Sequence, residues 1–227
     1  MKDATLQQVL ADQAAKRAVV LATDLASGEE WLIYPFEAGD DRLKKEAEDA
    51  ARRDKSSVVE TIGAKVFLNV YNPPLRLIIV GAVHIAQPLA RMAAMTGYDV
   101  TVIDPRAAFA SEERFPGVTV ITEWPDDAMT ALAPDARTAI VTLTHDPKID
   151  DPALEVALRS AAFYIGALGS KKTHSARLQR LGEAGFGDTD VARICGPVGL
   201  AIGAKSPAEI AVAVLAQITE RLRQPPA

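Results

Sequence analysis

The chain has 227 residues and a mass of 24.2 kDa, which excludes a disulfide-stabilised miniprotein and, at about 150 residues per domain, suggests one or two domains. Hydrophobic residues make up 48% and charged residues 24%, so a disordered, collagen-like or coiled-coil protein is excluded. With 25 Lys and Arg against 30 Asp and Glu, the net charge is −5 and no basic block is present. We therefore expect no nucleic-acid partner.

The cysteine content and the hydrophobic runs bear on location. Cys195 is the single cysteine, so an internal disulfide is excluded, and the N-terminal residues form no apolar signal core. No apolar run reaches the ~20 residues that a bilayer span requires. We expect a cytoplasmic protein without a membrane segment.

Two consecutive prolines, in Asn72-Pro73-Pro74, separate segments with different patterns. Such a connector continues neither a helix nor a central strand, so we place the domain boundary there, between residues 1–71 and 75–227. The first part is expected to be a small α+β module that opens with a helix. Its further predicted elements are strands 19–23 and 31–34, a charged helix within 40–55, and a hairpin of strands 58–60 and 65–70.

From residue 75 onward, short apolar runs alternate with helical patterns. This order predicts an α/β fold, a Rossmann-like parallel sheet with helices on both faces. The predicted strands are 76–80, 99–103, 118–121, 138–143, 162–165 and 191–195, and the predicted helices are 84–96, 125–132, 151–159, 172–184 and 207–223. The last helix has the clearest start, because Ser206, Pro207 and Glu209 form a capping-box pattern.

Candidate ligand-binding residues lie at the carboxyl ends of the predicted strands, where open parallel sheets bind ligands. Strand 76–80 runs into Gly81-Ala82-Val83-His84, which has the form of a dinucleotide phosphate turn with Val83 in place of the second glycine. A β-branched side chain there would obstruct a pyrophosphate, so ordinary NAD binding is disfavoured but not excluded. A tight packing turn is an equally good interpretation.

Asp104 follows Gly81 at the ~20-residue spacing of the acid that binds a ribose hydroxyl, and Arg106 comes next but one. A turn-capping carboxylate beside a solvated arginine is the alternative. Because the glycine turn lies upstream, we favour a binding role for both residues.

Thr144-His145-Asp146 follows strand 138–143. His145 beside Asp146 is compatible with an acid–base pair, a metal-binding corner or an anion contact, and also with a hydrogen-bonded structural histidine. The following Asp150-Asp151-Pro152 is more simply interpreted as a helix cap.

Two glycine-containing loops complete the set of candidates. Gly166 and Gly169 precede Ser170 and two lysines at the start of a helix, a sequence that suits an anion, although a plain glycine turn is equally compatible. Gly196 and Gly199 expose backbone before the last helix. Cys195 has no Cys or His at metal-ligand spacing, so we expect an inert buried thiol and no metal site.

Six motifs together resemble one known family: Gly81–Ala86, Val102–Arg106, Leu143–Asp146, Tyr164–Ser170, Gly196–Leu200 and Ser206–Ala211. They resemble, across residues 75–223, the XdhC/CoxI family of xanthine dehydrogenase accessory proteins. The resemblance implies a chaperone that binds molybdenum cofactor (molybdopterin or its dinucleotide) and delivers it to an apo molybdenum hydroxylase, often after sulfuration by a cysteine desulfurase. A family-like homodimer is compatible with it.

The chain departs from the family pattern at two places. Residues 1–71 lack the cysteine-bearing, glycine-rich motif of longer members, and Ala201 stands where the family has an aspartate. Cofactor binding through that sulfur, and a carboxylate role at that position, are therefore not carried over.

Three hypotheses follow: a molybdenum cofactor chaperone, an NAD(P)-dependent oxidoreductase with His145 as proton donor, and a nucleotide-sensing module. The first is preferred, which makes a non-catalytic maturation factor the expectation, with His145 and Asp146 as the only catalytic candidates. The candidate cofactor-binding residues are Gly81, Ala82, Val83, His84, Asp104, Arg106, Thr144, His145, Asp146, Gly166, Gly169, Ser170, Gly196 and Gly199.

Overall fold

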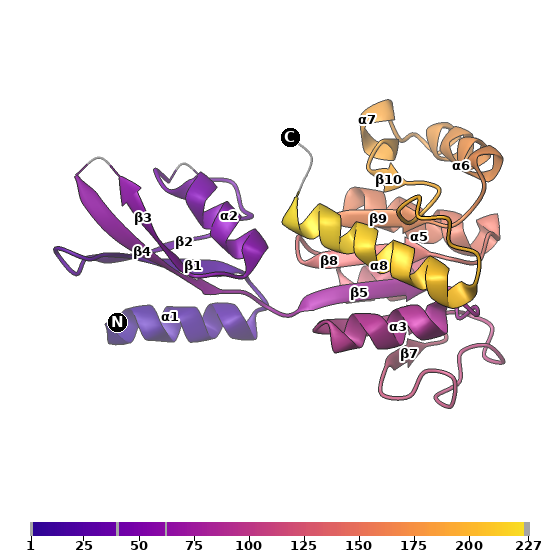
Figure 1. The fold of residues 1–227 in the computed structure, drawn as a ribbon, viewed down its shortest axis with the longest axis horizontal. Coiled ribbons are helices and arrows are strands. Elements are labelled where there is room, and N and C mark those ends of the chain that lie inside the picture. Colours follow the sequence, from indigo (N-terminus) through magenta and orange to yellow (C-terminus); the bar gives the residue numbers. More distant parts are fainter. Residues whose placement is uncertain (1, 40, 62, 225–227) are drawn as a thin grey trace. The chain divides into compact units, whose positions relative to one another are not determined.

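The computed structural model describes residues 2–39, 41–61 and 63–224. The chain divides into two compact units, Met1–Pro73 and Pro74–Ala227, and each has its own sheet (Figure 1).

The first unit is a four-stranded antiparallel sheet with the order β2-β1-β4-β3. Its elements are α1 (Asp3–Ala14), β1 (Val19–Asp24), β2 (Glu30–Ile33), α2 (Lys44–Arg53), β3 (Ser57–Thr61) and β4 (Ala64–Tyr71). Alanines of α2, Ala47 and Ala51, pack against Val20 and Leu68 of the sheet. The helix predicted within 40–55 is thus shorter, and Asp40 lies outside the described residues.

The second unit is a six-stranded, entirely parallel sheet with the order β10-β9-β8-β5-β6-β7. Its strands are β5 (Leu75–Val80), β6 (Tyr98–Ile103), β7 (Thr119–Ile121), β8 (Thr138–Thr142), β9 (Tyr164–Ala167) and β10 (Ile194–Cys195). Its helices are α3 (Ala86–Met95), α4 (Pro125–Leu132), α5 (Pro147–Arg159), α6 (Lys171–Glu183), α7 (Asp188–Val191) and α8 (Pro207–Arg223). The predicted fold class is confirmed.

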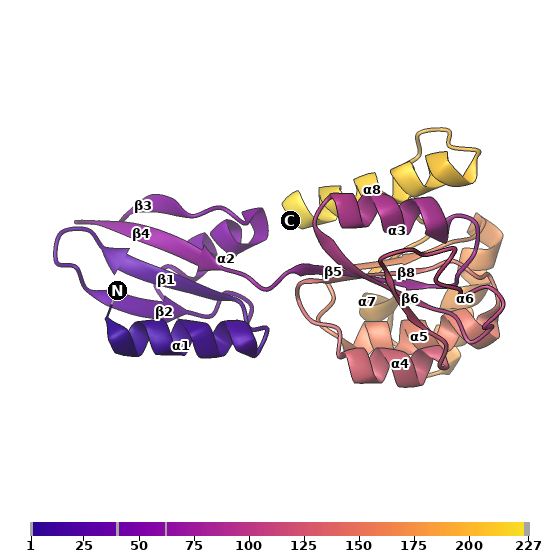
Figure 2. The ribbon, with the colours of Figure 1, turned by 90° about the horizontal axis from the view of Figure 1, so that it is seen from below.

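The helices of this unit cover both faces of the sheet. Figure 2 shows α3 and α8 on one face and α4 and α5 on the other. Along β5, Leu77 and Ile79 belong to the core under α3 and α8, whereas Ile78 and Val80 belong to the core under α4 and α5. A strand that is buried on both faces needs a continuous apolar run, which is the pattern the sequence has.

Three predicted elements of this unit have wrong boundaries. Helix α5 starts at Pro147 instead of 151, because Asp146 accepts a hydrogen bond from the Lys148 N–H and caps it. Strand β9 starts at Tyr164 instead of 162, since the Ser160 hydroxyl accepts from the Ala162 N–H and holds a turn there. The strand predicted over 191–195 is a short helix, α7, followed by the two residues of β10.

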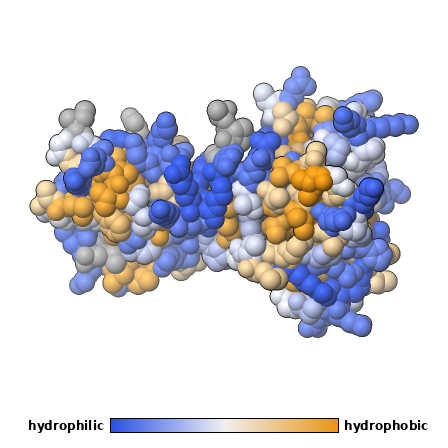
Figure 3. All heavy atoms as spheres, in the orientation of Figure 1, coloured by the Kyte–Doolittle hydropathy of each residue, from blue (hydrophilic) through white to orange (hydrophobic). Residues whose placement is uncertain are grey.

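Helix α8 begins as its sequence predicts. Ser206 Oγ accepts from the Glu209 N–H at 3.3 Å, and Glu209 Oε2 accepts from the Ser206 N–H at 2.9 Å. Apolar side chains gather on the face of the unit that carries α8 (Figure 3), where Ile202 and Val212 are exposed. No helix in the described ranges is both long and apolar enough to cross a bilayer.

Candidate functional site

The carboxyl ends of the parallel strands bring most of the candidate residues to one edge of the sheet. Strands β6 and β7 lie on one side of β5, and β8, β9 and β10 lie on the other. The chain therefore changes direction between β5 and β8, and such a switch point is where open α/β sheets form a ligand crevice. Gly81 follows β5 directly, and Thr144 follows β8 by two residues.

Gly81 and Thr144 approach each other closely across this switch point. Gly81 has φ +108°, and a Cβ added to it would lie 2.6 Å from Thr144 Cγ2 and 3.3 Å from Thr144 N. A side chain at position 81 is thus excluded by both backbone conformation and space. The glycine of the predicted phosphate turn serves a close approach between two loops of the protein.

The other residues of this turn point in different directions. Ala82 is fully buried, and half-buried Val83 packs against the core under α3 and α8. His84 is exposed. The β-branched side chain of Val83 thus contributes to the core at this position.

Asp104 and Arg106 form one unit after β6. Asp104 Oδ1 accepts from the Arg106 N–H at 3.0 Å and Nε at 2.9 Å, and Oδ2 accepts from Arg106 Nη2 at 2.7 Å and the Ala82 N–H at 2.8 Å. Burial acts to raise the pKa of Asp104, but the hydrogen bonds from Arg106 and Ala82 outweigh it and hold the pKa below its ordinary value.

Asp104 is fully buried, whereas the Arg106 side chain is 39% exposed. The arginine also lies over the Phe109 ring, 4.6 Å from the centroid. The Asp104 carboxylate is therefore used within the protein, and the guanidinium of Arg106 is the group that this pair presents at the surface.

Asp150 is a site residue that the sequence analysis interpreted only as a cap. It is 1% exposed and accepts hydrogen bonds from Thr144 N and Thr144 Oγ1 with Oδ1, and from His145 N with Oδ2. Burial raises the pKa of Asp150, and the bonds from Thr144 and the charge of Arg177 oppose that rise. The buried carboxylate holds the turn in which His145 has φ +61°.

The loop after β9 lies beside this turn. Gly169 has φ +153°, and a Cβ there would lie 3.1 Å from Thr173 and 3.8 Å from His145 Nδ1. Ser170 Oγ accepts from the Thr173 N–H at 3.1 Å and is the N-cap of α6. Gly169 and His145, predicted from separate motifs, are thus neighbours.

Gly166 and Gly199 are explained by packing. A Cβ on Gly166 would lie 2.6 Å from Val198 Cγ2, and one on Gly199 would lie 3.2 Å from Ala213 of α8. The Gly199 N–H also donates to Gln217 Oε1 at 2.8 Å, which the Tyr164 hydroxyl shares. Both glycines allow the β9 and β10 ends to approach their neighbours.

Gly196 lies against α6. A Cβ on it would lie 2.1 Å from His174 Nδ1, so only glycine fits beside this ring. His174 Nδ1 is buried without a hydrogen-bond partner. Burial, aided by the charge of Arg177, lowers the pKa of His174.

The donor set of this edge suits an anion. Among residues 2–39, 41–61 and 63–224, no group of three or more His, Cys, Asp or Glu side chains is placed to hold a metal ion. Cys195 lines a separate hollow of about 290 Å³ with Tyr164, Arg193 and Arg221. Burial raises the pKa of its thiol, so it is a poor metal ligand or nucleophile at neutral pH.

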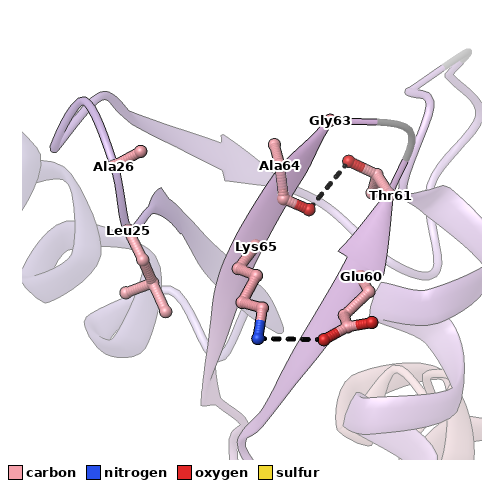
Figure 4. A pocket seen from close by; sticks show the side chains of 7 residues that line it. All are labelled: Leu25, Ala26, Glu60, Thr61, Gly63, Ala64 and Lys65. Atoms are coloured by element: carbon pink, nitrogen blue, oxygen red, sulfur yellow. Dashed lines mark hydrogen bonds and ion pairs between the residues drawn. The ribbon is translucent and has the colours of Figure 1, made fainter.

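A further hollow of about 470 Å³ lies in the first unit, between Leu25 and the β3–β4 hairpin (Figure 4). Its two charged side chains, Lys65 and Glu60, point toward each other and form an ion pair at 3.1 Å. Thr61 Oγ1 donates to the carbonyl of Ala64. These polar groups bind one another, and no sequence motif marks this hollow.

Residues 77–218 match the family model described as the XdhC Rossmann domain. The chain is 30% identical over 179 residues to uncharacterized protein YqeB of Escherichia coli (strain K12), which covers 79% of this chain and 32% of YqeB. It is 35% identical over 155 residues to molybdenum cofactor insertion chaperone PaoD of the same strain, covering 68% and 42%. It is 33% identical over 180 residues to a probable xanthine dehydrogenase subunit of Bacillus subtilis (strain 168), covering 76% and 52%.

A solved structure is similar over nearly the whole chain. The crystal structure of a xanthine dehydrogenase from Bacillus halodurans is 26% identical with a TM-score of 0.67, and the match covers 97% of this chain and 64% of that one. The chain spans about half or less of the three curated relatives. The match of a family model to residues 77–218 confirms the resemblance that the strand-end motifs carry: the chain belongs to the XdhC family, and these residues are its Rossmann domain.

Proposed function

We propose that this chain binds molybdenum cofactor at the carboxyl edge of its parallel sheet and assists insertion of the cofactor into a molybdenum hydroxylase of the xanthine dehydrogenase type. The observation that carries the proposal is the Arg106 guanidinium, held at the surface by buried Asp104 beside the Gly81 turn, in a chain 35% identical to a molybdenum cofactor insertion chaperone.

The residues at this edge fit the phosphate end of the cofactor. Molybdopterin carries a phosphate, for which a fixed guanidinium and the free N–H groups of a helix start are suitable donors. Arg106 supplies the first, and the Ser170 end of α6 supplies the second. When bound, the cofactor supplies the metal–dithiolene chemistry that the receiving hydroxylase uses.

The protein's part is to bind and to orient. Asp104 holds Arg106 in one geometry through two bonds from its guanidinium, so this arginine meets an anion with little loss of conformational freedom. Asp150 fixes the Thr144–His145 turn beside it. Because the described residues offer no metal-ligand cluster, binding through the organic end leaves the metal end available for transfer.

The geometry gives less support to the two alternatives, an NAD(P)-dependent oxidoreductase and a nucleotide-sensing module. Asp104, the acid expected to bind a ribose hydroxyl, already accepts four hydrogen bonds from the protein. A cysteine desulfurase, a homodimer and a cytoplasmic location stay predictions from the sequence.

Two measurements test the proposal. The chain is titrated with molybdopterin, and its retention by an immobilised apo-hydroxylase is measured with and without the cofactor. We expect Arg106→Ala to weaken cofactor binding about tenfold or more, the value of one charged hydrogen-bonding group, and exposed Arg91→Ala on α3 to leave it within about twofold. Retention of neither cofactor nor hydroxylase by folded wild-type protein would refute the proposal.

A further inference from the structure

Arg177 is a buried cation directed at the start of its own helix. It lies on α6 and is 1% exposed. Its Nη2 donates to the Leu168 carbonyl at 2.9 Å, two residues before Ser170, and lies 3.7 Å from Asp150 Oδ2. The guanidinium is therefore placed below the Thr144–His145 turn after β8 and the Leu168–Ser170 turn after β9.

Most of the hydrogen-bonding capacity of this guanidinium is unused. Arg177 Nε and Nη1 are buried and have no hydrogen-bond partner. Asp150, the carboxylate that faces it, already accepts three hydrogen bonds from Thr144 and His145. Leaving charged donors buried and unpaired is costly, so an acceptor supplied from outside would stabilise this side chain strongly.

The N-terminal turn of α6 adds unused backbone donors. Ser170 Oγ takes the Thr173 N–H, but no hydrogen bond among the described residues uses the N–H of Lys171 or Lys172. Both lysine side chains are exposed. At the start of a 13-residue helix, these donors and the helix dipole favour an anion.

The charges that face this turn leave it positive. Arg180 is paired with Asp151, Nε to Oδ2 at 2.5 Å, and so neither adds net charge. Asp150 balances Arg177, and Lys171 and Lys172 remain. The neighbouring Gly169 adds no side chain above the turn. This balance selects a doubly charged anion with several acceptor oxygens.

We propose that the N-terminal end of α6 is a phosphate-binding subsite, in which a phosphate monoester accepts from the N–H groups of Lys171 and Lys172 and from Arg177. Arg177 reaches the phosphate by exchanging the Leu168 carbonyl for a phosphate oxygen. The inference deepens the proposed function, on which it rests for the identity of the cofactor but not for phosphate binding itself. Arg177 lies outside every motif that the sequence analysis selected.

Inorganic phosphate is the probe for the full chain, titrated at constant ionic strength against chloride and followed by amide NMR. In the wild type we expect saturable shifts that are largest at Lys171 and Lys172. Arg177→Met should weaken phosphate binding about tenfold or more, since one charged donor group is lost. Arg180→Met, which removes a cation three residues along the same helix, should change it by less than about threefold.

Several results would overturn this inference. They are shifts centred on Gly81–Val83, an absence of saturable shifts, unchanged affinity in Arg177→Met, or equal weakening in the two variants. If Arg177→Met does not fold, the wild-type shift map still decides, and Arg177→Lys replaces it as the variant. Molybdopterin binding without phosphate shifts at α6 refutes the subsite alone, whereas phosphate binding without retention of molybdopterin or hydroxylase refutes the proposed function alone.

Discussion

Asp150 accepts hydrogen bonds from both the backbone N–H and the hydroxyl of Thr144, at 3.2 and 2.6 Å. Its second oxygen accepts from the His145 N–H at 3.0 Å. One buried carboxylate in the first turn of α5 therefore sets the shape of the loop that follows β8. Because Thr144 also contacts Gly81, the same carboxylate fixes one wall of the switch-point crevice.

Asp150→Asn should destabilise the second unit by about 3 kcal/mol, because the amide cannot accept on both sides and leaves Arg177 as an uncompensated buried charge. Urea unfolding followed by Trp124 fluorescence in a Trp31→Phe background measures this, since Trp31 belongs to the first unit. The matched control is Asp151→Asn, which breaks only a partly exposed pair with Arg180 and should cost less than about 1 kcal/mol. Equal losses in the two variants would contradict the role given to Asp150.

Gly81→Ala should destabilise the fold by roughly 2 kcal/mol, through its positive φ and through contact of the new methyl group with Thr144 Cγ2. Thr144→Ser removes that Cγ2 and keeps the hydroxyl that Asp150 accepts from. In the double variant, part of the loss should be recovered, while the backbone strain stays. Thermal unfolding of the four proteins in the cycle gives the coupling; purely additive effects would show that the two loops do not meet as described.

Asp104 should make the fold sensitive to acid. Its depressed pKa means that the folded state binds the proton less tightly than the unfolded state, so ionised Asp104 stabilises the fold above the ordinary pKa of 3.8. This contribution is lost as the pH falls through the still lower folded pKa. The difference in unfolding free energy between wild type and Asp104→Asn should therefore shrink below about pH 4.

The control for this pH dependence is exposed Asp99→Asn on the same strand. Unfolding free energies are compared at pH 3, 4, 5 and 7 for the three proteins. A difference between wild type and Asp104→Asn that stays constant across this range would contradict the pairing of Asp104 with Arg106.

The parallel sheet was predictable because its strands are buried on both faces. Val80, Ile103 and Val141 stand in continuous apolar runs that alternate with helical patterns, and that order leaves few folds open. The strand ends were harder to predict. At Ser160 and Asp146, side chains bind nearby backbone N–H groups, so the boundary depends on a local hydrogen bond rather than on periodicity.

The candidate site was predictable in its position but not in its contacts. The motifs named Gly81, Asp104 and Gly169 because they directly follow strands. Asp150 and Arg177 lie inside helices, where a charged residue is ordinarily exposed, and nothing in the periodicity indicates burial. Asp146-Pro147 is an N-cap and N1 pair, and it would have placed Asp150 inside the helix, in its first turn.

Cys195 should react slowly with alkylating agents, because burial raises the pKa of its thiol above the ordinary value. Arg221 opposes that rise through its charge and a hydrogen bond. The midpoint of the rate–pH profile should therefore lie above that of a free thiol and move further up in Arg221→Met, whereas exposed Arg223→Met on the same helix should leave it in place. Intact-mass measurement after iodoacetamide treatment gives an unambiguous readout, since the chain has one cysteine. A midpoint equal to that of glutathione, or one that falls in Arg221→Met, would contradict both the burial of the thiol and its pairing with Arg221.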